Sequence, residues 1–118
     1  MEAGAARAGE GALRWRLWAL GPILLLAIVV RRSELVRVYL ANLTEFDLIN
    51  SFHLHADFFR YQPTGTGDHW EHTDIVMQCQ GQRGVIEIDF QHTGLFMFHA
   101  HQSEFTELGW MGYFNVVD

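Results

Sequence analysis

The sequence has no lysine and only one cysteine. Its eight basic residues are all arginines, and fourteen acidic residues bring the formal net charge to -6 at pH 7. Such a surface repels phosphate groups and has no basic stripe with interleaved aromatic residues, which excludes nucleic acid as a partner. A single cysteine excludes an intrachain disulfide, and we expect Cys79 to be a small apolar residue of the core.

A long apolar run is also missing. A membrane-spanning helix needs roughly 20 apolar residues, whereas the longest uncharged run, Leu17–Val30, has fourteen and contains Pro22. Two arginines precede this run and two follow it, which suits a membrane interface better than a protein interior. We therefore expect residues 1–32 to form a disordered start and then an apolar helix, either a membrane anchor or an export signal. The chain would accordingly be membrane-anchored or exported.

Residues 33–118 have a β pattern throughout and are expected to form one domain. Short apolar segments are separated by turn-like sequences, most of which contain glycine. The segments predicted to be strands are Leu35–Ala41, Ser51–Phe59, Thr73–Cys79, Gly84–Phe90, Leu95–His101 and Met111–Val117. No helical period follows Val30, so the fold class is all-β, an antiparallel sandwich or barrel.

Four of the seven histidines form two H-x-H pairs, each within a predicted strand. The pairs are His53 with His55 and His99 with His101. Because residues i and i+2 of a strand share a face, each pair directs two imidazoles the same way. Imidazole is the commonest protein ligand for copper and zinc, so the pairs could converge on one metal site or on half of a shared site. His69 and His72 lack such a partner and are expected to be solvated loop residues.

The order and spacing of several segments resemble the last cupredoxin domain of the multicopper oxidase family. The segments are Ser51–Asp57, Thr73–Val76 and Gly94–His101, followed by Glu107–Phe114. The last of them, E-L-G-x-x-G-x-F, is also similar to the second domain of copper nitrite reductases. The resemblance covers residues 33–118 and implies a cupredoxin-like Greek-key β-sandwich. The chain offers only about six strands, fewer than a complete sandwich has, so we expect the domain to be partial.

The resemblance also implies which residues bind copper. In the family, this domain carries H-x-x-H-x-H and, later, H-C-H. Carried over by position, His53 is the type 2 copper ligand, and His55, His99 and His101 are type 3 ligands. The positions of the type 1 copper ligands are held by Asn50, Ala100, Phe105 and, at the axial position, a residue near Trp110. A type 1 site needs a thiolate and two imidazoles, so no type 1 copper is expected.

Four imidazoles are too few for a trinuclear cluster, which the family builds from two domains. We therefore expect another cupredoxin domain, or a second copy in a homo-oligomer, to complete the copper site. The chain would be part of an oxidoreductase that reduces dioxygen or nitrite, and an enzyme only when paired with a domain that bears type 1 copper. Asp57 or Glu104 is expected to accept a hydrogen bond from a ligand histidine.

Two other interpretations remain open at this point. The chain could be a membrane-tethered copper- or zinc-binding module without redox turnover, because four histidines on two strands could hold one ion. Alternatively, the histidines could simply pack and form hydrogen bonds inside a degenerate sandwich.

Overall fold

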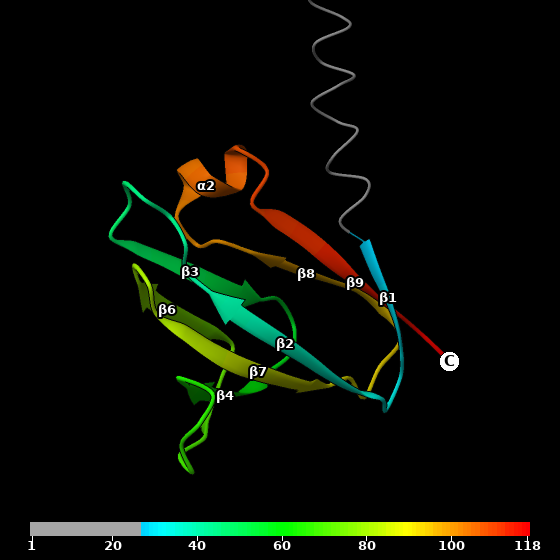
Figure 1. Cartoon of the computed structure of the whole chain (residues 1–118). Helices are drawn as coiled ribbons and strands as arrows, with labels where there is room; N and C mark the ends of the chain where they lie inside the picture. The colour runs from blue at the N-terminus through cyan, green and yellow to red at the C-terminus, as the bar shows by residue number, and fades with distance from the viewer. Residues whose placement is uncertain (1–26) are drawn as a thin grey trace, which may run out of the picture.

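Two β-sheets pack face to face in the computed structural model, which describes residues 27–118 (Figure 1). Sheet A has the strand order β1 (Ala27–Arg31), β9 (Met111–Val117), β8 (Gly94–His99), β3 (Ile49–Leu54) and β6 (Ile75–Cys79). Sheet B has the order β2 (Leu35–Ala41), β7 (Arg83–Asp89), β4 (Phe59–Pro63) and β5 (Glu71–Thr73). The predicted all-β sandwich is therefore confirmed, and its described part has nine strands instead of about six.

The hydrophobic core lies between the sheets and follows the two-residue period of the strands. On β3, Phe52 and Leu54 point inward, while His53 between them points to the opposite face of sheet A. On sheet B, Ile86 and Ile88 of β7 are fully buried and pack with Phe59 of β4. A core of aliphatic and aromatic side chains therefore packs against the inner face of sheet A, opposite the face to which His53 points.

The first described strand corrects the prediction of an apolar helix that extends to Val30. Residues 27–31 form β1, which pairs in parallel with β9 at the edge of sheet A (Figure 1). Ile28, Val29 and Val30 are β-branched and favour a strand, and Val30 packs against the core. The remainder of the predicted helix, residues 17–26, lies outside the described residues. Within residues 27–118, no helix is both long and apolar enough to span a membrane.

The predicted strand Ser51–Phe59 is two strands in different sheets. β3 ends at Leu54, and the chain turns through residues 55–58 before β4 begins at Phe59. Ala56 adopts a φ of 62° in this turn, a conformation that non-glycine residues rarely adopt and that a sequence pattern does not reveal.

A short helix and an exposed cysteine were also not predicted. The helix α2 (Ser103–Glu107) has only five residues, too few for a helical period to be visible. Cys79 is exposed rather than buried, because β6 is an edge strand and Cys79 alternates with the buried Gln78.

Candidate metal centre

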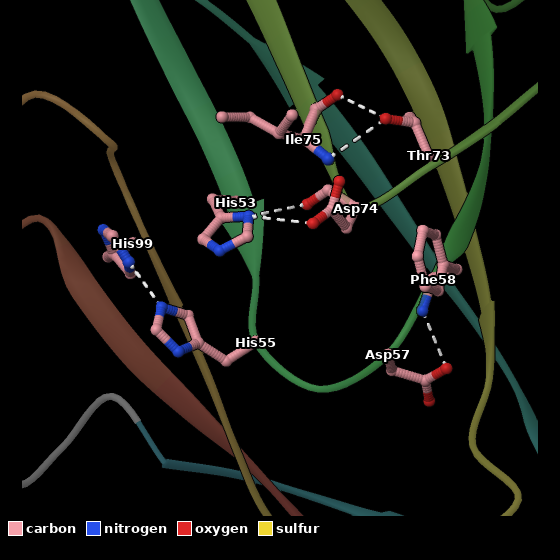
Figure 2. Close-up of polar contacts among 8 residues, drawn as sticks. All are labelled: His53, His55, Asp57, Phe58, Thr73, Asp74, Ile75 and His99. Atoms are coloured by element: carbon pink, nitrogen blue, oxygen red, sulfur yellow. Dashed lines mark hydrogen bonds and ion pairs between the residues drawn. The ribbon is translucent and has the colours of Figure 1, made fainter.

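The two histidine pairs lie side by side on the outer face of sheet A. β3 and β8 are antiparallel neighbours, and their register places His53 directly opposite His99. His55 follows the end of β3, and His101 follows the end of β8. Figure 2 shows the imidazoles of His53, His55 and His99 turned toward one another in front of the two strands. Sequence positions more than 40 residues apart are therefore brought together by strand pairing.

Three of the four histidines direct ligand atoms to a common point. One ring nitrogen from each of His53, His55 and His99 lies within 4.8 Å of the others. The Nε2 atoms of His55 and His99 are only 2.7 Å apart (Figure 2). Two ring nitrogens at that distance share a proton in the metal-free protein, or they bind a common cation or neighbouring cations. The arrangement therefore fits copper or zinc, both of which imidazole binds.

The fourth histidine stands beside this group. The ring centroid of His101 is 5.3 Å from that of His53 and 5.7 Å from that of His99. His101 is exposed, whereas the other three histidines are half-buried. The structure thus gathers all four predicted site residues on one face, with three converging closely and His101 at the rim.

Backbone carbonyl groups fix the ring orientation of two of the histidines. Nδ1 of His53 donates to the carbonyl oxygen of Asp74 at 3.0 Å, and Nδ1 of His99 donates to that of Ala100 at 2.6 Å. Since a carbonyl only accepts, the proton is on Nδ1 in both rings, which leaves the Nε2 lone pair free for a metal. Asp74 lies beside His53 in Figure 2. The distance from its carboxylate to Nδ1 of His53 is 3.8 Å.

The environment of His55 favours its neutral form. Burial lowers the pKa of His55 below the ordinary value of 6.5, and the nearby His53, His99 and His101 lower it further. A protonated imidazole cannot bind a metal, so a lower pKa keeps this ligand available at more acidic pH.

The predicted carboxylate partners, Asp57 and Glu104, are not the ones that the structure uses. Asp57 accepts a hydrogen bond from the backbone amide of Phe58 at 2.8 Å and points away from the imidazoles in Figure 2. Within residues 27–118, neither carboxylate accepts a hydrogen bond from a histidine ring. Asp74 was missed because the pairing of β3 with β6, which brings it to His53, is not visible in sequence spacing.

The residues that the resemblance assigns to the type 1 positions lack suitable ligand atoms. Ala100 is fully buried, and its amide donates to the carbonyl of Trp110 at 3.1 Å, while the amide of Trp110 donates to Phe105 at 2.9 Å. The buried Asn50 accepts a hydrogen bond from the amide of Ser51 through its own side chain. None of these side chains offers a thiolate or an imidazole.

The remaining histidines of the central loop are not part of the site. The side chain of His69 is 77% exposed. His72 is also exposed, but it belongs to β5 rather than to a loop, and its ring packs beside Phe58 with a centroid separation of 5.4 Å.

An exposed apolar surface surrounds the candidate site. The strand registers place the side chains of Ile49, Ile75 and Met77 on the same face of sheet A as His53, and that of Leu95 on the same face as His99. Of these, Met77 is 67% exposed and Leu95 is 69% exposed. We call this set of residues the sheet A outer face: Val29, Ile49, Ile75, Met77 and Leu95. These residues lie on four strands, β1, β3, β6 and β8, that share this face of the sheet.

Comparison with known proteins shows which family the chain resembles. The chain matches a family model described as multicopper oxidase over residues 23–118. A multicopper oxidase of known crystal structure shares 55% identity with the chain, with a TM-score of 0.74, over 76% of this chain and 32% of that one. A search of curated proteins found no relative.

More distant structures share the fold. A multicopper oxidase from Pediococcus acidilactici is 21% identical, with a TM-score of 0.67, over 77% of this chain and 21% of that one. The copper nitrite reductase from Nitrosomonas europaea is 17% identical, with a TM-score of 0.68, over 77% of this chain and 32% of that one. The chain therefore spans about a third or less of the length of these proteins.

These similarities confirm the predicted cupredoxin-like sandwich. The family match includes every residue that the structure describes and all four histidines of the site. The chain belongs to the multicopper oxidase family.

Proposed function

We propose that this chain is a copper-binding domain of an oxidoreductase, in which His53, His55, His99 and His101 are type 2 and type 3 ligands of a copper cluster. The cluster is completed by another cupredoxin domain or by a second copy of the chain. When bound, copper supplies the redox chemistry that passes electrons to a small-molecule oxidant, dioxygen or nitrite.

The convergence of the three half-buried imidazoles carries this proposal. His55 follows the end of β3 and His99 lies on β8, yet their Nε2 atoms are 2.7 Å apart. Burial and the neighbouring histidines also lower the pKa of His55, which keeps its imidazole neutral and able to bind a metal. Carbonyl partners hold the Nδ1 protons of His53 and His99, so their Nε2 atoms face the centre as ligands. Copper binding would replace the hydrogen bond between the Nε2 atoms of His55 and His99.

Electrons must reach this cluster from outside the domain. The single cysteine, Cys79, lies on β6 and is exposed, while the buried Ala100 lies between His99 and His101. A type 1 copper centre requires a cysteine thiolate. The electron donor is therefore a type 1 centre in a partner domain or subunit.

The sheet A outer face supports a partner at the same place. Its exposed apolar residues flank the histidines on β3, β6 and β8. A domain that docks there buries this surface and adds ligands to the four imidazoles. Metal binding and assembly are then coupled, because neither half has a full ligand set alone.

The test is copper loading of the full chain, followed by electron paramagnetic resonance, absorbance spectroscopy and oxygen uptake. With Cu(II) alone, we expect an imidazole-coordinated signal without intense blue absorbance, and His53→Ala should weaken binding about 100-fold. The double variant His69→Ala/His72→Ala removes two exposed imidazoles and is the matched control, with binding unchanged. Oxygen uptake should appear only in a copper-loaded assembly that also contains a type 1 centre.

Two results would count against the proposal. An intense blue band from the chain alone would mean that a type 1 site exists and that the positional assignment is wrong. One tightly held copper or zinc ion per chain, without turnover in any assembly, would instead favour a binding module that has no redox role.

A further inference from the structure

His101 lies beyond the end of the strand that carries it. β8 ends at His99, whose backbone is held by pairing with β3 on one side and β9 on the other. Continuing the β3–β8 register from the His53–His99 pair by two residues places Ser51 opposite His101. The two strands are not paired there, so the sheet ladder alone leaves the fourth histidine unsupported.

Side-chain hydrogen bonds bridge the gap at this point. The backbone amide of His101 donates to Oγ of Ser51 at 2.8 Å. The hydroxyl of Ser51 in turn donates to Oε1 of Gln102 at 2.6 Å, and Nε2 of Gln102 donates to the carbonyl of Ile49 at 2.9 Å. These three bonds connect two residues of β3 with two residues of the segment after β8, and they substitute for the missing backbone pairs.

The burial of Ser51 and the direction of the Gln102 side chain both favour these three hydrogen bonds over alternatives. Ser51 is only 8% exposed, so water cannot easily replace its partners. Gln102 is the residue at the N-cap of α2, yet its side chain makes no capping hydrogen bond. Glutamine is not a favoured N-cap residue. The side chain of Gln102 is instead directed to β3, which indicates that its role here is the bridge rather than the helix end.

We infer that Ser51 and Gln102 are positioning residues that hold His101 at the candidate metal centre. The inference rests on the proposed function, because it assigns these residues to a histidine that the proposal makes a ligand. His99 has two strand neighbours and a carbonyl partner for its ring. The backbone of His101 has the Ser51 hydroxyl in place of a strand partner. Loss of the bridge therefore releases His101 and leaves His99 in place.

The first test needs no metal. Amide hydrogen exchange of the full chain is measured by nuclear magnetic resonance in the wild type, Ser51→Ala, Ser51→Thr and Gln102→Ala. We expect the His101 amide to exchange roughly five- to tenfold faster in Ser51→Ala, the effect of losing one hydrogen bond, and to remain protected in Ser51→Thr, which keeps the hydroxyl. The His55 amide, which donates to the Met97 carbonyl, is the internal reference. An unchanged His101 exchange rate in Ser51→Ala overturns the inference.

The second test uses Cu(II) alone. Ser51→Ala and Gln102→Ala should each weaken copper binding by about tenfold, Ser51→Thr should restore it, and Ser51→Ala should add nothing in a His101→Ala background. Wild-type affinity in Ser51→Ala, alongside a loss in His101→Ala, overturns the positioning role. If the wild type binds no copper, the proposed function fails, and the exchange experiment still decides whether the bridge holds His101.

Discussion

Glu87 is a buried carboxylate on the outer face of sheet B, between two arginines. Its side chain is 4% exposed, and Arg37 and Arg60 both donate to it. The Arg37 hydrogen bond lowers the pKa of Glu87 below the ordinary value of 4.5, and Arg60 contributes in the same direction while burial opposes both. The guanidinium of Arg60 also stacks over the ring of Trp70 at 4.9 Å. The cluster therefore ties β2, β7 and β4 together.

We expect Glu87→Gln to lower the free energy of unfolding by about 1–2 kcal/mol at pH 7, a modest value because both arginines are about half exposed to solvent. Since the pKa of Glu87 is lower in the folded than in the unfolded chain, its charge stabilises the fold above about pH 4.5. That contribution is lost as the pH falls further. In urea unfolding, the difference in free energy of unfolding between the wild type and Glu87→Gln should become smaller below about pH 4.5.

Asp89→Asn is the matched control for this prediction, because Asp89 is an exposed carboxylate on the same strand. It should leave stability within about 0.5 kcal/mol of the wild type. A deficit of equal size at pH 7 and pH 3 in Glu87→Gln would contradict the assignment to charge.

Asp74 provides a second prediction at the residue scale. Nδ1 of His53 is bonded to the backbone carbonyl of Asp74, and the carboxylate is more distant at 3.8 Å. Since every residue supplies a carbonyl, we expect Asp74→Asn to change Cu(II) affinity by less than about fivefold, the effect of a weak electrostatic contact with a partly exposed carboxylate. Isothermal titration of Asp74→Asn and of His53→Ala with Cu(II) compares the two losses of affinity. A loss in Asp74→Asn as large as that in His53→Ala would assign the role to the carboxylate.

The sequence could predict that the four histidines gather on one face, but not which residues orient their rings. An H-x-H pair in a predicted strand directs two imidazoles to one face through the period of the strand. In the structure, His55 and His101 lie just beyond the ends of β3 and β8. Their partners come from strand registers and from turns. The Asp74 carbonyl depends on the β3–β6 pairing, and the Ser51–Gln102 bridge depends on where β8 ends. Such partners are backbone groups or common polar side chains, which carry no distinctive sequence signal.

At the scale of single elements, position 84 of β7 has no room for a side chain. A Cβ atom built on Gly84 would lie 2.8 Å from Cζ of the buried Tyr61, and so overlap its ring. We expect Gly84→Ala to destabilise the domain by about 1–3 kcal/mol, the usual effect of overpacking. Gly67→Ala is the control, because its nearest heavy atom would be 3.9 Å away. Equal thermal unfolding temperatures for the two variants would mean that Tyr61 moves freely.

The strands themselves were predictable where a segment alternates or has clear turns at both ends. β2 and β9 have the predicted bounds, Leu35–Ala41 and Met111–Val117. The apolar residues of β1 continue an apolar run that predicts a helix, and only their pairing with β9 reveals the strand. The division between β3 and β4 depends on the left-handed conformation of Ala56. Local pattern therefore predicts strand existence, whereas sheet membership requires tertiary contacts.

At the scale of the whole molecule, the two outer faces of the sandwich differ. The outer face of sheet B carries the Glu87 cluster with its two arginines. The sheet A outer face carries exposed apolar residues around the histidines. Counting ligands in the sequence indicates that a partner is needed, and under the proposed function the partner would dock on the sheet A outer face.

This difference leads to a prediction about assembly. Met77 is 67% exposed on β6, and its register partner is Ser51. We expect Met77→Glu to leave the unfolding temperature of the chain unchanged, because exposed substitutions have little effect on stability. Binding of a single Cu(II) ion should be equal or stronger, since an added negative charge attracts a cation. Assembly and oxygen uptake should nevertheless be lost, because docking would bury the new carboxylate without a partner.

Tyr39→Glu is the matched control, because Tyr39 is 76% exposed on β2, on the opposite face of the sandwich. Sedimentation velocity of the copper-loaded chain mixed with a cupredoxin domain that bears a type 1 centre, with oxygen uptake on the same samples, separates the two variants. If Met77→Glu assembles and consumes oxygen as the wild type does, the partner docks elsewhere and the sheet A outer face has another role. If Tyr39→Glu alone is defective, the docking surface is on sheet B, and the cluster is then not completed at this interface.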